Sequence, residues 1–227
     1  MVTESTRNSR AFRFGECAMP GKKTSSAVKN AAADLAALRR AARRCRACPL
    51  WEKATQTVFG EGPDDARLFV IGEQAGDKED LQGHPFVGPS GKLLDRALAD
   101  AGIAREQIYV TNVIKHFKFE LRGKRRLHKR ADATEIAACS QWLDRELARV
   151  QPRYVVCLGA MAAHVMLGAE FGLMRERGKW HRLEDGRWCL ATVHPSYVLR
   201  SRIAGGFDDT YAGFVADLKQ LRRLPRK

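Results

Sequence analysis

The chain has 227 residues, and its 40 Lys and Arg against 26 Asp and Glu give a formal net charge of +14 at pH 7. With 44% hydrophobic residues it can bury one sizeable core, and its basic charge favours nucleic acid as a partner over an anionic membrane surface. No apolar run is long enough to span a bilayer and residues 1–26 lack the apolar stretch of a secretory signal, so we expect a bacterial cytoplasmic protein. We also expect a monomer.

Residues 1–30 are rich in Ser, Thr, Lys and Arg, which predicts a flexible basic N-terminal arm before a single domain over residues 31–227. Within that domain, segments with apolar residues at helical spacing alternate with short apolar runs typical of buried strands. This alternation predicts an α/β fold with three layers, α/β/α, around a central four-stranded parallel sheet. The predicted helices cover residues 31–44, 90–101, 133–150, 160–167 and 208–221. The predicted strands cover residues 67–71, 107–114, 153–158 and 188–192.

Each predicted strand leads into a distinctive loop. The loops cover residues 72–91 and 115–132, the turn after residue 159, and residues 194–202. Because parallel strands place their carboxyl ends at one edge of a sheet, these loops should gather at that edge and form the ligand site.

The most basic of these loops contains a single histidine. Six of the nine residues from 122 to 130 are Lys or Arg, and His128 lies among them. Such a run is either a solvated face or a phosphate-binding strip, with Lys124, Arg125 and Arg126 as candidate contacts. Surrounding positive charge disfavours imidazolium, so a neutral His128 could act as a nucleophile. The alternative is a histidine that only contacts phosphate.

The first loop combines glycines, carboxylates and an aromatic side chain. Its glycines would let the backbone approach a ligand closely. Glu73, Asp77 and Asp80 supply candidate carboxylates, whereas Glu79 fits an ordinary solvated position. Phe86, held between two prolines, could offer a rigid face on which a base stacks.

Two further loops carry groups suited to a nucleotide. The amide of Asn112 can donate and accept hydrogen bonds together, as a pyrimidine edge requires, although turns and caps are commoner uses of asparagine. His194 follows the last strand and could bond a base oxygen as negative charge builds on it. Ser196 and Arg200 could hold phosphates. A structural histidine is the alternative at position 194.

The six cysteines include one Cys-x-x-Cys pair, Cys45 and Cys48. In a reducing cytosol such a pair more often binds metal or does redox chemistry than forms a structural disulfide. Zinc and an iron–sulfur cluster both fit, and the spacing does not choose between them. Cys157 and Cys189 lie in predicted strands and fit buried, unligated cysteines, while Cys17 lies in the arm.

Four segments together resemble the motifs of the uracil-DNA glycosylase superfamily, especially its iron–sulfur family 4. They are Gly-Glu-Gln-Ala-Gly at 72–76, Phe-Val-Gly-Pro at 86–89, Thr-Asn-Val at 111–113 and His-Pro-Ser at 194–196. Gln74 with Asp-Lys-Glu-Asp at 77–80, and Lys-Arg-Arg-Leu-His at 124–128, resemble the UdgX group of that superfamily. The resemblance covers roughly residues 31–224. Ala75 stands where the group typically has Pro, and the arm is not covered.

The resemblance implies excision of uracil from DNA, duplex or single-stranded. Phe86 would stack on the base, Asn112 would read its edge, and His194 would hydrogen-bond it as it leaves. In the UdgX group the loop histidine, here His128, then attacks C1′ and stays bonded to it. Glu73 would orient that histidine or stabilise the cation. The implied uracil- and DNA-binding residues are Gln74, Asp77, Asp80, Phe86, Asn112, Lys124, Arg125, Arg126, Ser196 and Arg200.

The resemblance also implies a [4Fe–4S] cluster. Cys45, Cys48 and Cys139 match three of the four family 4 ligands, and His116 falls on the other position; Cys157 is the second choice for that ligand. Two alternatives stay open. The chain could be a conventional turnover family 4 glycosylase in which His128 only contacts phosphate, or a non-catalytic iron–sulfur protein that binds uracil-containing DNA.

Overall fold

The computed structural model describes residues 34–224, so the predicted arm and Cys17 lie outside the described residues. The four predicted strands are β1 (Leu68–Gln74), β2 (Ile108–Ile114), β5 (Tyr154–Leu158) and β7 (Trp188–Thr192). They lie in the order β2–β1–β5–β7, and every one of these pairings is parallel. The predicted α/β fold is therefore confirmed.

The sheet has one strand more than the sequence predicted. β6 (Trp180–Arg182) pairs antiparallel with β7 and forms the edge of a five-stranded sheet. Three residues are too few to carry a periodic signal, which is why the pattern missed this strand.

The segment expected as a loop over residues 115–132 is instead a β-hairpin. β3 (Phe119–Arg122) and β4 (Arg125–His128) pair antiparallel, with Phe119 opposite His128. Gly123 and Lys124 make the two-residue turn, and only Gly123 has a positive φ, 60°. Glycine at the first turn position is the signature of a type II′ hairpin turn. The high charge of this segment hid its strand character.

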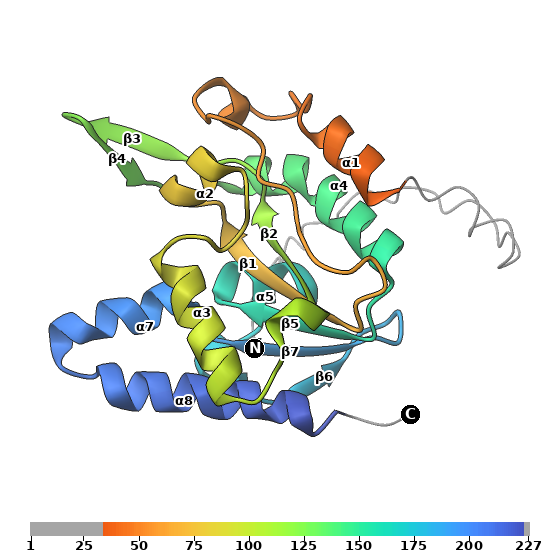
Figure 1. Cartoon of the computed structure of the whole chain (residues 1–227), viewed down its shortest axis with the longest axis vertical. Helices are drawn as coiled ribbons and strands as arrows, with labels where there is room; N and C mark the ends of the chain where they lie inside the picture. Colours follow the sequence, from red (N-terminus) through yellow and green to blue (C-terminus); the bar gives the residue numbers. More distant parts are fainter. Residues whose placement is uncertain (1–33, 225–227) are drawn as a thin grey trace, which may run out of the picture. The chain divides into compact units, whose positions relative to one another are not determined.

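Helices cover both faces of the sheet (Figure 1). On one face lie α1 (Leu35–Ala42), α4 (Ala133–Val150) and α5 (Ala160–Leu167), and on the other lie α3 (Pro89–Asp100), α7 (Pro195–Ser201) and α8 (Phe207–Lys219). Successive side chains of a strand point to opposite faces. Accordingly Phe69 and Ile71 join the core with α4, whereas Val70 joins the core with α3. Two shorter helices are α2 (Asp77–Gln82) and α6 (Leu173–Glu176).

Helix α4 matches its predicted bounds because its start is capped strongly. The Asp132 carboxylate accepts from the Glu135 N–H at 3.0 Å, and the Glu135 carboxylate accepts from the Asp132 N–H at 2.8 Å. This reciprocal pair is a capping box, and it satisfies two backbone donors that the first helical turn leaves open. The helix places Glu146 against Thr111 of β2 and Cys139 against the N–H of Lys115, the residue after β2.

Two expected loops at the carboxyl edge of the sheet contain helices. α2 lies within residues 72–91, and α7 occupies most of residues 194–202. Both are too short to show helical periodicity in the sequence. Among residues 34–224, none of the helices combines the length and apolar character that crossing a membrane requires.

Candidate functional site

A pocket of about 550 Å³ lies at the carboxyl edge of the parallel strands. Its lining comes from the ends of β1, β2 and β4, from α2 and α7, and from the loop before α3 together with the first turn of α3. Eight of the residues predicted for the site line it: Glu73, Gln74, Phe86, Asn112, His128, His194, Ser196 and Arg200. Four lining residues were not predicted: Gly76, Glu79, Ser90 and Arg130.

Asn112 and Phe86 meet over Gly72 on one wall of the pocket. A Cβ at Gly72 would lie 2.3 Å from Asn112 Oδ1 and 2.6 Å from Phe86 Cζ, so any larger residue would displace both side chains. Phe86 has a φ of 60°, a left-handed conformation that is strained for an aromatic residue. Asn112 is only 3% exposed. The wall therefore presents an aromatic face and an amide from nearly buried side chains.

The hydrogen bonds of His194 fix which of its ring nitrogens carries the proton. Its Nδ1 accepts from the Ser196 backbone N–H at 3.1 Å, so Nδ1 is unprotonated. Burial lowers the pKa of His194 to about 4, with Arg200 and His128 contributing in the same direction. The ring is therefore neutral near pH 7 and carries its proton on Nε2 as a hydrogen-bond donor.

His128 ends β4, with its ring 6.0 Å from that of Phe117. Partial removal from water lowers the pKa of His128 below its ordinary 6.5, although Glu73 raises it and Arg200 lowers it. A ring with a lowered pKa is neutral near pH 7, so it has a lone pair available. The influence of Glu73 also indicates that this carboxylate lies near the imidazole.

Arg126 holds the hairpin against α2. Its Nε lies 2.7 Å from Asp77 Oδ1, and its Nη1 lies 2.6 Å from Asp80 Oδ2. The guanidinium also lies 5.1 Å from the ring centroid of Phe119. Asp77, Asp80 and Arg126 were predicted to bind DNA or uracil; the structure pairs them with one another, outside the pocket lining. The sequence shows opposite charges at positions 77, 80 and 126. Their contact could not be predicted, because it depends on the hairpin that brings Arg126 to α2.

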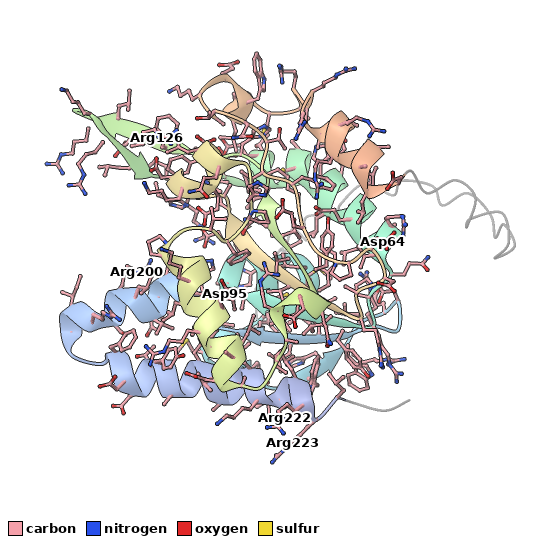
Figure 2. The ribbon with its side chains drawn as sticks, in the orientation of Figure 1. Asp64, Asp95, Arg126, Arg200, Arg222 and Arg223 are labelled. Carbon is pink, nitrogen blue, oxygen red and sulfur yellow. The ribbon has the colours of Figure 1, made fainter. Side chains whose placement is uncertain are left out.

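Exposed cations lie on the hairpin, in the segment just after it and on α7. Lys124 and Arg125 lie at the turn and the start of β4 and are exposed, and neither lines the pocket. Arg200 lies on α7 and donates through Nη1 to Ser196 Oγ at 3.1 Å. Figure 2 labels Arg126 on the hairpin and Arg200 on α7, on the same side of the molecule. Arg200 and Arg130, which follows β4, both line the pocket, so these two cations can contact one ligand there.

Glu79 was expected to be solvated, and the structure corrects this. The side chain is buried, and its Oε1 accepts from the Gly88 N–H at 2.9 Å. The contact ties α2 to the loop that carries Phe86. A loop carboxylate between other carboxylates gives no sequence signal for burial, so this role could not be predicted.

A fully buried ion pair lies beneath Asn112. Lys115 Nζ donates to Glu146 Oε2 at 2.5 Å and to the Asn112 carbonyl at 2.7 Å. Glu146 Oε1 also accepts from the Gly60 N–H at 2.8 Å. A buried pair is stabilising only when its remaining hydrogen bonds are satisfied, as they are here. The pair fixes the backbone from which Asn112 projects. Its only sequence signal was the charge of Lys115 directly after an apolar strand.

The predicted metal ligands gather only in part. Lys115 N–H donates to Cys139 Sγ at 3.3 Å, and Cys48 and Cys45 lie near enough to raise the pKa of Cys139, which burial lifts to about 11. His116 Nε2 instead lies 2.9 Å from Thr57 Oγ1. Across residues 34–224, no three His, Cys, Asp or Glu side chains are arranged to hold a metal ion. The donor types suit a cluster, but the arrangement does not close around one.

Cys157, the second choice for the fourth ligand, lies elsewhere. It is fully buried within β5, with its sulfur 3.6 Å from that of Cys189. Both residues belong to the core between the sheet and α5. The expectation that both cysteines are buried is confirmed, and its position within β5 separates Cys157 from the pair at positions 45 and 48.

Comparison with known proteins identifies the family of this chain. The family model described as the uracil DNA glycosylase superfamily matches residues 59–219. The chain is 35% identical over 161 residues to the "Type-4 uracil-DNA glycosylase" of Thermotoga maritima, which covers 70% of this chain and 80% of that protein. It is 37% identical over 166 residues to the protein of that name from Archaeoglobus fulgidus, covering 68% and 78%. For that of Pyrobaculum aerophilum the identity is 32% over 189 residues, covering 80% and 93%. The chain belongs to the uracil DNA glycosylase superfamily.

Proposed function

We propose that this protein excises uracil from DNA and then becomes covalently bonded through His128 to C1′ of the abasic site. The observation that carries the proposal is one pocket lined by an aromatic ring, Phe86, a side-chain amide, Asn112, and two imidazoles whose pKa values are lowered, His128 and His194. Relatives named type-4 uracil-DNA glycosylases support the excision step. The net charge of +14 supports DNA as the substrate.

Recognition begins with a deoxyuridine turned out of the base stack, at a cost of a few kcal/mol. Phe86 stacks on the uracil, and the amide of Asn112 donates and accepts along its edge. Gln74 Oε1 is buried in the pocket wall without a protein partner among the described residues, so it offers the substrate a further acceptor. Cytosine presents the reverse donor and acceptor pattern to Asn112 and is rejected because those groups would stay unpaired.

Cleavage of the glycosidic bond leaves its electron pair on the base. His194 donates from Nε2 to a uracil oxygen as negative charge builds there, which stabilises the leaving anion. Its low pKa suits this role, because a neutral imidazole donates a hydrogen bond without giving up its proton. C1′ meanwhile becomes oxocarbenium-like and needs an electron pair from a nucleophile.

His128 supplies that electron pair in place of water. Its neutral ring nitrogen attacks C1′, and the resulting imidazolium loses the proton on its other nitrogen. Glu73 lies near enough to raise the pKa of His128, so it is placed to orient the ring or to face the cation. The neutral N-alkyl imidazole that remains is a poor leaving group, so the bond persists. Each protein molecule therefore acts once.

We further propose that Cys45, Cys48, His116 and Cys139 hold a [4Fe–4S] cluster that ties the turn after α1, the segment after β2 and α4 together. The influence of Cys45 and Cys48 on the pKa of Cys139, and the N–H that Cys139 accepts, support this. The cluster would be structural, because glycosidic cleavage needs no redox step. Iron and acid-labile sulfide should be present in anaerobically purified protein at about four atoms each per chain. Stoichiometric zinc with negligible iron would contradict the assignment.

A denaturing gel with uracil-containing single-stranded DNA tests the proposed function. Wild type should give a shifted band that survives denaturant and saturates at one DNA per protein. Free uracil with no shifted band would instead support a turnover glycosylase, the activity in the relatives' names. Neither product would support a protein that only binds uracil-containing DNA.

A further inference from the structure

A second hollow lies at the base of the β3–β4 hairpin. Its volume is about 270 Å³. Small-molecule pockets usually begin at roughly 300 Å³, so this hollow has room for a single ring system rather than for an extended ligand. Its lining comes from the short helix η1 (Pro49–Glu52), from the segment leading into β3 and from the first turn of α4. This hollow, the hairpin cleft, is lined by Pro49, Leu50, Glu52, Lys53, Phe117, Lys118, Phe119 and Glu135.

The interior of the hairpin cleft is apolar and aromatic. Leu50 and Phe117 are buried, Phe119 is half-buried and Pro49 is exposed. The rings of Phe117 and Phe119 stack with their centroids 5.1 Å apart. Because Phe119 is only half-buried, part of its side chain is open to a ligand. Aromatic side chains hold unpaired bases by stacking, and every base has a face that can stack.

The hairpin cleft and the pocket are neighbours. The Phe117 ring, which lines the cleft, lies 6.0 Å from the His128 ring, which lines the pocket. Phe119 is paired directly with His128 across the hairpin, and the Cβ atoms of such pairs are about 4.5–5.5 Å apart. Neighbouring nucleotides of one strand are about 3.4 Å apart along a duplex and farther apart once the strand is extended. A base one or two positions from a uracil in the pocket is therefore within reach of the cleft.

Cations connect the two hollows. Arg130 lines the pocket and Lys118 lines the hairpin cleft. Lys129 lies between them, because it follows His128 and its N–H donates to the Lys118 carbonyl at 2.9 Å. Lys129 Nζ lies 3.0 Å from a carboxylate oxygen of Glu120, but its side chain is still 52% exposed. The phosphates of a strand that enters both hollows can therefore contact these cations.

The rim of the hairpin cleft favours a base over a peptide as its occupant. Glu52 is exposed there. The cations along the hairpin favour an acidic peptide, which the Glu52 carboxylate would repel. The amino groups of adenine, cytosine and guanine can instead donate a hydrogen bond to that carboxylate. An unpaired base therefore fits the apolar interior, the carboxylate and the basic path together.

We propose that the hairpin cleft binds an unpaired base that lies one or two nucleotides from the uracil in single-stranded DNA. The inference rests on the proposed function, since it extends the path of the bound strand beyond the pocket. The base stacks on Phe119, and the strand crosses the hairpin beside Lys129 and Lys118. A base that stays paired in a duplex cannot enter the cleft, so this contact belongs to single-stranded substrate.

Single-turnover uracil release from single-stranded DNA tests the cleft, with the half-saturating protein concentration as the readout. Four modified strands each lack one base, replaced by a tetrahydrofuran, at the first or second position on either side of the uracil. With wild type, removing the base at one of these positions should raise the half-saturating concentration about tenfold, because the stacking contact is lost. The same half-saturating concentration for the intact strand and all four modified strands would overturn the proposal.

Phe119→Leu tests whether that loss arises in the cleft. Leucine keeps an apolar side chain beside Arg126 but removes the ring. On the intact strand the variant should raise the half-saturating concentration by about the same factor as removal of the base. On the strand that lacks the critical base it should add less than about twofold, because both changes remove one contact. Phe119→Tyr keeps the ring and should behave as wild type. Losses that multiply would show that base and ring do not meet, and would overturn the proposal.

Phe171→Ala is the matched control. Phe171 is also half-buried, its ring lies 5.2 Å from that of His181, and it lines neither the pocket nor the hairpin cleft. This variant should keep the wild-type response to each modified strand. The outcomes also separate the cleft from the underlying function. Uracil release that is insensitive to every base removal would overturn the cleft alone, whereas absence of uracil release by wild type from the intact strand would refute the proposed function.

Discussion

The two regions that form the pocket differ in how firmly they hold their side chains. The sheet edge presents Asn112 and His194 from strand ends that are buried on both faces and fixed by the Lys115–Glu146 pair and the α7 cap. The hairpin presents His128 from a two-stranded ribbon. Its main link to the body is the Arg126 clamp, the pair of contacts that Arg126 makes with Asp77 and Asp80 of α2. In the proposed function, base recognition and departure depend on the sheet edge, and trapping depends on the hairpin. We expect substitutions to separate these two activities.

His128→Ala should have the largest effect on adduct formation, and it should separate trapping by the hairpin from uracil release at the sheet edge. The adduct should be abolished, because no other side chain offers a neutral nitrogen at that position. Uracil release should continue, since Asn112 and His194 remain in place and water can enter the vacated space as a slow nucleophile. A denaturing gel scored together with free uracil would show this. Loss of both products would mean that His128 also supports departure of the base.

Asn112→Ala should damage both activities together. Removing the amide leaves the uracil edge without its paired donor and acceptor, which costs about 1–3 kcal/mol and corresponds to roughly a 5-fold to 150-fold slower release. Adduct formation should slow by the same factor because it follows release. The measurement is single-turnover kinetics on single-stranded DNA. Wild-type action on cytosine as fast as on uracil would refute the assigned role of this amide.

Acidification should suppress trapping before it suppresses release. The neutral form of His128 is the reactive one, and its pKa lies below the ordinary 6.5. His194 stays neutral until the pH approaches its pKa of about 4. In the window between these values, the ratio of adduct to hydrolysed abasic product should fall about tenfold for each pH unit below the pKa of His128. A constant ratio across that window would contradict a neutral imidazole nucleophile.

Arg126→Ala should slow trapping more than release. Without the guanidinium, Asp80 stays fully buried without its cationic partner and the hairpin loses its link to α2. Misplacing a nucleophile by about 1 Å can cost on the order of 100-fold in rate, so the adduct rate should drop by about 10-fold to 100-fold. Exposed Arg125→Ala is the control for loss of charge alone. Equal slowing of release and trapping would show that the clamp supports the whole pocket.

The smallest expected effect concerns the exposed cations. About five phosphate contacts would give a log–log salt slope of binding near −4 to −5 on duplex DNA, and somewhat less on single strands. Lys124→Ala should reduce the steepness of that slope by about 0.9, with little change in the single-turnover rate at saturating protein. A salt-independent affinity before crosslinking would contradict this electrostatic account.

The sequence predicted the sheet region far better than the hairpin region. Long apolar strands and the capped helix over residues 133–150 carry strong periodic signals, and parallel topology then places Asn112 and His194 at one edge. The sequence pattern did not predict the hairpin, because its two strands are short and charged. The Arg126 clamp, the burial of Glu79 and the Lys115–Glu146 pair depend on contacts between segments far apart in sequence. No local pattern announces such contacts.

The position of the covalent bond tests the central claim most directly. Wild-type protein can be reacted with uracil-containing DNA, digested with protease and nuclease, and mapped by peptide mass. The account predicts a deoxyribose-linked remnant on His128, within the peptide that follows Arg126. A remnant on Lys124 or Lys129, present as a reducible Schiff base, would contradict it and assign trapping to the amines of the hairpin.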